Sequence, residues 1–295
     1  MTIQEMSQDT TSDQEQKMAE DFLTEEQIKR TAVRRKIRIH SLQLAIAIGL
    51  MGSWQFLTDR KIIDRFFFGQ PSGVWKQLVY WFQHGTDVGS IWLNAWVTLE
   101  EASLGFLSGV LLGIIFGVFL GRNRVAAEVF APYIKVSNSI PRVVLGSIFI
   151  VWLGLGTLSK VALAFVLVFF PVFFNAFQGT READKKLISN ARLLGASKRQ
   201  VTRHVVMPSA LSWITASMHV SFGFALIGAI VGEFLGSQHG MGLIIATAQG
   251  TFNPNGVYAA MVIVAVIALS AEWLITKVED RLLNWRPTQV SGSEI

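Results

Sequence analysis

The sequence predicts an all-α membrane protein with six transmembrane helices. Of its 295 residues, 51% are hydrophobic and 16% are charged. The mean hydropathy is +0.42, and a soluble domain of this length rarely has such a balance. The apolar residues also form blocks, and about 20 consecutive apolar residues suffice to cross roughly 30 Å of hydrocarbon. The predicted spans are residues 39–57, 95–120, 125–155, 158–179, 209–235 and 257–277.

The chain begins with a polar segment, residues 1–36, which we expect to be a partly disordered cytoplasmic tail. This segment is too long and too acidic to be the n-region of a cleaved signal peptide. The basic run 34–38 then borders the span at 39–57. That span therefore has the pattern of an uncleaved signal anchor.

The distribution of basic residues predicts the orientation, because lysine and arginine resist translocation. With the N-terminus inside, the cytoplasmic connections carry most of these residues, in segments 122–124, 181–203 and 277–286. We therefore expect a multi-pass protein of the bacterial inner membrane with both termini cytoplasmic. Its transmembrane domain would cover 37–286, and its C-terminal tail 287–295. The same asymmetry accounts for the net charge of +5, so no nucleic-acid partner is expected.

The second and third spans contain features that shape a helix bundle. The second span has a glycine at every fourth position, which lets a neighbouring helix approach closely in lipid. The alternative is that the missing side chains leave room along a solute pathway. These glycines are Gly105, Gly109, Gly113, Gly117 and Gly121. In the third span, Pro141 is expected to break or kink the helix.

Ionisable and amide side chains inside the apolar spans are candidates for the translocation pathway, because such groups usually face protein or a water-filled cavity. The candidates are Glu101, Asn175 and Glu233. The alternative for Glu233 and Asn175 is a structural hydrogen-bonding role. The same structural role is expected of His219, whereas Glu272 is expected at the membrane interface.

The sequence contains no catalytic or cofactor motif. There is no cysteine, which excludes disulfides, thiolate metal sites and cysteine nucleophiles. The five histidines lack the paired spacing of a metal site, and no phosphate-binding glycine loop is present. We therefore expect no catalytic residue, no metal and no cofactor, and a protein that is not itself an enzyme.

A basic segment, "ARLLGASKRQVTRHVVMP" at 191–208, separates two of the most apolar stretches. Apolar residues recur around its start at helical spacing, at Leu187, Ala191 and Leu194, which predicts a short amphipathic helix over 185–194. Gly195 can end that helix, and "SKRQ" at 197–200 offers a capping box for the next one. The expected result is a rigid elbow of two short helices. The alternative is a helix lying on anionic lipid headgroups.

This segment resembles the cytoplasmic signature of permease subunits of binding-protein-dependent ABC importers, E-A-A-x3-G-x9-I-x-L-P. The chain reads Ser189-Asn190-Ala191, three residues, Gly195, nine residues, Val205-x-Met207-Pro208. The spacing matches throughout, although Ser189 replaces the usual glutamate. The similarity covers roughly 98–285, and it is greatest to permeases for sulfonates, taurine, nitrate, bicarbonate and pyrimidine precursors of thiamine.

The resemblance implies a type I importer fold in which the helix around 187–196 is the coupling helix. The implied partners are two copies of a separate ATPase subunit, a periplasmic or lipoprotein solute-binding protein, a second copy of the chain, and membrane lipid. The implied contacts with the ATPase are the apolar Leu187, Ala191, Leu194 and Ala196, the polar Arg192, Lys198 and Arg199, the pivot Gly195, and Pro208. The cargo would be a small polar or anionic solute. A secondary transporter or channel subunit without an ATPase remains the alternative, for which inverted repeats or paired intramembrane charges are typical.

Overall fold

The computed structural model describes residues 3–183 and 185–282. Over these residues the chain forms helices joined by short connections and has no β-strand, only an isolated bridge between Thr86 and Gly89. This confirms the all-α fold class. The predicted tail at 287–295 lies outside the described residues. The chain divides after Arg65 into two units, which are described separately.

The first unit is dominated by one helix, α1, which runs over Ile3–Asp59. The partial disorder and cytoplasmic location expected for 1–36 remain predictions. In the structure, α1 includes this segment from Ile3 onward. The physical reason is that no glycine or proline precedes Gly49, so that nothing in the sequence interrupts the helix. The predicted first span, 39–57, forms the second part of α1.

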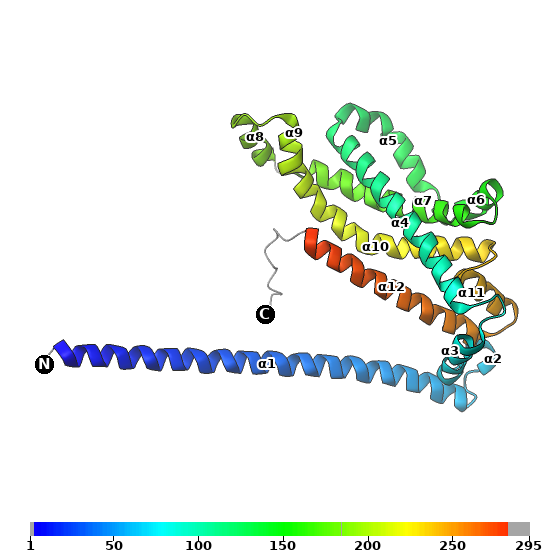
Figure 1. Cartoon of the computed structure of the whole chain (residues 1–295), viewed down its shortest axis with the longest axis horizontal. Helices are drawn as coiled ribbons and strands as arrows, with labels where there is room; N and C mark the ends of the chain where they lie inside the picture. The colour runs from blue at the N-terminus through cyan, green and yellow to red at the C-terminus, as the bar shows by residue number, and fades with distance from the viewer. Residues whose placement is uncertain (1–2, 184, 283–295) are drawn as a thin grey trace. The chain divides into compact units, whose positions relative to one another are not determined.

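The second unit contains the remaining helices (Figure 1). In chain order these are α2 (Arg65–Phe68), α3 (Pro71–His84), α4 (Ile91–Arg122), α5 (Arg124–Ser139), the 3-10 turn η1 (Arg142–Val144), α6 (Leu145–Leu153), α7 (Thr157–Arg181), α8 (Lys185–Leu193), α9 (Lys198–Val201), the π-helical turn η2 (Thr202–Val206), α10 (Met207–Leu235), α11 (Met241–Gly250) and α12 (Pro254–Leu282). Helices α8 and α9 lie at one end of this unit, and α3 and α11 lie at the other.

Four helical stretches in the described residues are long and apolar enough to cross a membrane: α4, α7, the continuous run Lys198–Leu235, and α12. The bent pair of α5 and α6 makes a fifth. These five stretches contain four of the five predicted spans that follow residue 90, and the fifth, 125–155, extends two residues beyond α6. The segment 39–57 is not among them, because His40, Gln43 and Gln55 dilute its apolar residues. The count of six therefore remains a prediction for its first member.

The fifth crossing is broken where the sequence predicts a break. Helix α5 ends at Ser139 and the path turns by 75° before α6. Ile140 has the extended φ of −79° and ψ of 129° that a residue before proline prefers, and Pro141 has no N–H to continue the helix. By contrast, Pro132 and Pro171 lie inside α5 and α7 without ending either helix.

The core of the bundle forms where α7 packs between α4 and α10. Every glycine of the α4 stripe faces a residue of α7, and the pairs are Gly105–Ala164, Gly109–Val168, Gly113–Val172, Gly117–Ala176 and Gly121–Thr180. A Cβ atom on Gly109 would lie 2.8 Å from the Cβ of Val168, which is too close for two side chains. Gly228 of α10 meets the backbone of the same Ala164 equally closely. The glycines therefore let three helices approach backbone to backbone.

Candidate functional site

The segment that begins at α8 forms the predicted elbow, which we define as residues Lys185–Val206. Gly195 has φ of +82°, the left-handed conformation that glycine adopts without strain. The N–H of Ala196 donates to the carbonyl of Ala191 at 2.9 Å, and the N–H of Gly195 donates to the carbonyl of Arg192 at 3.0 Å. These two hydrogen bonds form a Schellman motif, which fixes the end of α8.

The second arm of the elbow begins with the predicted capping box. The backbone N–H of Gln200 donates to Ser197 Oγ at 3.3 Å, and the N–H of Ser197 donates to Gln200 Oε1 at 2.8 Å. Helix α9 and the turn η2 then lead directly into α10, near whose start Pro208 lies. Since the chain is hydrogen-bonded on both sides of the bend, the elbow is a stiff extension of the α10 span.

A small core of its own holds the elbow together. Ala183, Val201 and Val206 are buried there, and Ile188, Ala191 and Ala196 pack against them. The predicted docking positions thus divide into two groups. Ala191 and Ala196 face the inside of the elbow.

The other predicted positions face outward. Leu187 is 54% exposed and Leu194 is 89% exposed. Arg192, Lys198 and Arg199 are exposed as well. Sequence reasoning missed Leu193, which is 85% exposed. Because α8 ends at Leu193, the helical periodicity that selected Leu194 no longer holds there, and the adjacent leucine shares its outward side.

At the opposite end of the bundle, a buried polar cluster joins α4, α7, α10 and α11. We define the polar cluster as Asn94, Thr98, Glu101, Lys160 and Glu233, none of which is more than 1% exposed. Glu101 and Glu233, predicted from the sequence, are brought together here. Asn94, Thr98 and Lys160 were missed, and the available signal was only that each is a polar residue near the end of an apolar block.

Glu233 is the centre of the polar cluster. Its Oε1 accepts a hydrogen bond from Thr98 Oγ1 at 2.7 Å, and its Oε2 accepts one from the N–H of Gly242 at 2.6 Å. The N–H of Met241 donates to Thr98 Oγ1 at 2.8 Å. A carboxylate at the N-terminus of α11 is favourable because the unpaired N–H groups of a helix start carry partial positive charge. Glu233 thus fixes α11 to α4 and α10.

Glycine is required at the contact with this carboxylate. Gly240 has φ of +117°, and a Cβ atom there would overlap the carboxylate of Glu233. Its N–H donates to Asn94 Oδ1 at 2.7 Å. The glycine therefore permits both the turn before α11 and the close approach of backbone to carboxylate.

Lys160 supplies the positive charge of the polar cluster. Its ammonium donates to the carbonyls of Leu155 and Gly156 and lies within electrostatic range of Glu101 and Glu233. Glu101 Oε2 is buried and has no hydrogen-bond partner. Complete enclosure of these charges favours the structural role left open for Glu233 in the sequence analysis. Asn175 lies elsewhere, half-buried on α7, and its amide donates to the carbonyl of Pro171 at 2.9 Å.

A second polar link joins α10 to α12. His219 Nδ1 lies 2.5 Å from Glu272 Oε1, and its Nε2 lies 2.6 Å from Glu279 Oε2. The two carboxylates lie on opposite sides of the ring, so no common point is available for a metal ion. Among the described residues, no group of three acidic, histidine or cysteine side chains is placed to hold a metal. The histidine therefore has the hydrogen-bonding role predicted for it.

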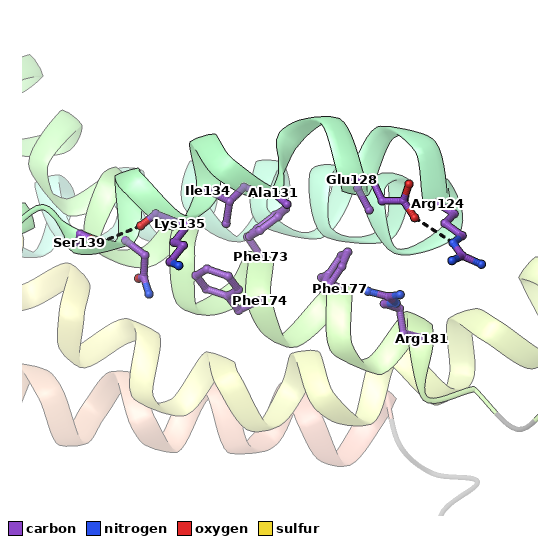
Figure 2. A pocket seen from close by; sticks show the side chains of 12 residues that line it. Arg124, Glu128, Ala131, Ile134, Lys135, Ser139, Phe173, Phe174, Phe177 and Arg181 are labelled. Atoms are coloured by element: carbon purple, nitrogen blue, oxygen red, sulfur yellow. Dashed lines mark hydrogen bonds and ion pairs between the residues drawn. The ribbon is translucent and has the colours of Figure 1, made fainter.

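A groove of about 480 Å³ runs between α5 and α7 (Figure 2). Phe174 and Phe177 of α7 form its apolar wall. Arg124 and Lys135 of α5 and Arg181 of α7 bring positive charge to it. Sequence reasoning missed this groove, because its two walls come from separate spans.

The fold is that of an all-helical protein with several stretches long and apolar enough to cross a membrane, and comparison with known proteins gives its family. Residues 109–284 match the family described as "Binding-protein-dependent transport system inner membrane component". The chain belongs to this family and is the permease subunit of an ABC importer.

Two relatives support the assignment at the level of sequence. The chain is 32% identical over 198 residues to the putative aliphatic sulfonates transport permease protein SsuC of Bacillus subtilis, covering 67% of this chain and 72% of the relative. It is 31% identical over 192 residues to the formylaminopyrimidine transport permease protein ThiX of Halalkalibacterium halodurans, covering 65% and 77%.

A solved structure supports the fold. The chain aligns with a chain of the MetNI methionine ABC transporter in an inward-facing conformation, with a TM-score of 0.55 and 20% identity. The alignment covers 66% of this chain and 96% of that one. The likeness extends the family assignment to the three-dimensional arrangement of the helices.

Proposed function

We propose that this permease carries a small polar or anionic solute across the inner membrane and is driven by two copies of a separate ATPase subunit that dock on the elbow. A solute-binding protein would deliver the solute at the end of the bundle that holds α3 and α11. A second copy of the chain would complete the pathway, as expected for a short permease that forms a symmetric dimer. In this arrangement the elbow and both termini lie in the cytoplasm.

The observation that carries the proposal is the stiffness of the elbow combined with its exposed leucines. Hydrogen bonds on both sides of Gly195 hold the two arms at a fixed angle. Leu193 and Leu194 nevertheless stand almost fully exposed, and burying a leucine side chain is worth about 1.5–3 kcal/mol. A groove on a partner would therefore gain several kcal/mol by accepting both, with Arg192, Lys198 and Arg199 at its rim.

Such an interface would keep the partner attached while it moves. A partner shifts a two-state equilibrium only by its difference in affinity for the two states, and the ATP cycle of the ATPase would supply that difference. Since the elbow continues directly into α10, a partner that moves the elbow also moves a membrane span. The docking surface would be Leu187, Leu193 and Leu194, while Ala191 and Ala196 would maintain the shape of the elbow.

The names of the relatives support the choice of solute class. SsuC is named for aliphatic sulfonates and ThiX for a formylaminopyrimidine, both small and polar. We propose a solute of that kind for this permease. ATP hydrolysis would take place in the partner, so that the chain itself would not be an enzyme.

A substitution at Gly195 tests the proposal. No atom lies within 4 Å of a Cβ built there, so any effect of a side chain arises from its backbone conformation. Gly195→Leu should distort the bend and abolish both ATPase co-purification and ATP-driven uptake in proteoliposomes. Gly195→Asn is the matched control, because asparagine tolerates the left-handed conformation, and it should retain most of both activities. Wild-type uptake by Gly195→Leu would refute the role of the elbow.

A further inference from the structure

We propose that the groove between α5 and α7 binds the oxyanion group of a small organic anion at Lys135, with its apolar part against Phe174 and Phe177. This inference rests on the proposed function, because the anion would be the solute that the permease carries. In this proposal Lys135 gives the groove between α5 and α7 a preference for negatively charged solutes.

The first argument is the excess of positive charge along the groove. Arg124 is neutralised by Glu128, whose Oε1 lies 2.9 Å from its Nε. Neither Lys135 nor Arg181 has a carboxylate within ion-pairing distance among the residues that the structure describes. The guanidinium of Arg181 lies instead over the ring of Phe177, at 5.2 Å from its centroid. Lys135 and Arg181 therefore bring to the groove (Figure 2) two cations that no carboxylate of the described residues pairs with.

The second argument is a third cation beside the groove. Arg142 follows the break in the span and donates from Nη2 to Asn138, which lines the groove. Its guanidinium lies over Phe170, at 4.5 Å from the ring centroid. Its Nε is buried without a hydrogen-bond partner. Positive charge thus continues from α5 past Pro141, with donor capacity that the described residues do not use.

The position of these cations within a span makes them expensive. An arginine or lysine in the hydrocarbon region costs a few kcal/mol unless it meets water, a counterion or protein. Lys135 lies 11 residues beyond Arg124, or about 16 Å along α5, inside the bent apolar stretch that α5 and α6 form. A cation kept within such a stretch without a carboxylate is explained if the groove is hydrated and receives an anion.

The chemistry of the groove selects its ligand. Ammonium and guanidinium groups form charge-assisted hydrogen bonds with sulfonate, carboxylate or phosphate oxygens. The phenylalanine wall suits the apolar part of such a molecule, and about 480 Å³ lies within the range of small-molecule sites. An anionic lipid headgroup has the same chemistry, and the experiment distinguishes it from a free solute.

The absence of cysteine from the chain permits a direct test. Ala131→Cys places a thiol in the groove of the full importer in lipid nanodiscs. Its rate of modification is measured with an anionic methanethiosulfonate, the sulfonatoethyl reagent, and with a cationic one, the trimethylammonioethyl reagent. Gln238→Cys, in the exposed loop before α11, gives the rate ratio outside the groove.

We expect the anionic-to-cationic rate ratio to be at least about fivefold higher at position 131 than at position 238, because the local potential concentrates anions. Adding Lys135→Gln should reduce that ratio about fivefold, whereas Lys135→Arg should preserve it. Millimolar ethanesulfonate should slow modification at 131 and leave 238 unchanged. A ratio that does not respond to Lys135→Gln would overturn the proposal.

Two further measurements are needed. One distinguishes a lipid headgroup from a free organic anion, and the other distinguishes anion binding in the groove from ATPase docking on the elbow. If phosphatidylglycerol in the nanodisc blocks position 131 and ethanesulfonate does not, the groove is a lipid site and our inference is wrong. ATPase association is measured on the same samples, because it depends on the elbow and not on Lys135. Loss of association with an intact rate ratio would refute the proposed function alone.

Discussion

The two ends of the helix bundle are held by opposite means. The elbow is closed by backbone hydrogen bonds between near neighbours in the chain, and it presents its leucines and basic side chains to the outside. The polar cluster is closed by side chains that are far apart in sequence, and it hides every charge. The difference supports the proposal that the elbow is a docking surface for another molecule, whereas the polar cluster joins helices within the chain.

The largest effect on stability is expected at the centre of the polar cluster. Glu233→Ala leaves the hydroxyl of Thr98 and the N–H of Gly242 without their buried acceptor, and each unsatisfied buried group costs about 1–3 kcal/mol. Glu233→Gln keeps one acceptor and should lose less. Thermal unfolding of the purified permease measures both.

The matched control for this prediction is Glu128→Ala. Glu128 pairs with Arg124 on the surface, where an ion pair is worth about 0–1 kcal/mol. Its Tm should remain close to that of the wild type. An equal fall in Tm for the Glu128 and Glu233 variants would mean that the polar cluster does not stabilise the bundle.

An intermediate effect is expected for the glycine stripe between the two ends. Gly109→Ala would place a methyl group 2.8 Å from Val168, and overpacking costs about 1–3 kcal/mol. Gly223→Ala in α10 meets no atom within 4 Å and should be neutral or stabilising, because alanine favours helix by about 1 kcal/mol over glycine. The same chemical change should therefore alter Tm in opposite directions. A similar fall for both variants would show that flexibility, and not close approach, explains the stripe.

The contrast between the ends also explains what the sequence predicts. The bonds around Gly195 and Ser197 join residues three to five positions apart, so residue order alone indicates them. The contact between Asn94 and Gly240 joins residues 146 positions apart. Glu101 and Glu233 stand out as charges in apolar spans, but no periodic pattern shows that they meet, or that Lys160 lies with them.

The helical bundle follows the same rule. Apolar blocks predict five of the spans, and Pro141 predicts the break in one of them, since each signal lies within the element that it forms. The groove at Lys135 needs two spans to create it, and no local pattern reports their distance. In the N-terminal segment two local signals disagree. The polar composition predicts partial disorder, whereas the absence of glycine and proline before Gly49 permits the helix α1.

The smallest effect on stability is expected at the exposed leucines, where the effect on ATPase association should be large. Replacing both Leu193 and Leu194 by serine removes no packing within the described chain, because they are 85% and 89% exposed, so unfolding should change by no more than about 0.5 kcal/mol. ATPase association should nevertheless weaken by at least about tenfold, since the partner loses two buried leucines. Thermal unfolding and co-purification, measured side by side, separate these outcomes. A variant that unfolds early and still binds the ATPase would show that these leucines belong to the core of the permease, and the distinction between an exposed docking end and a buried polar cluster would fail.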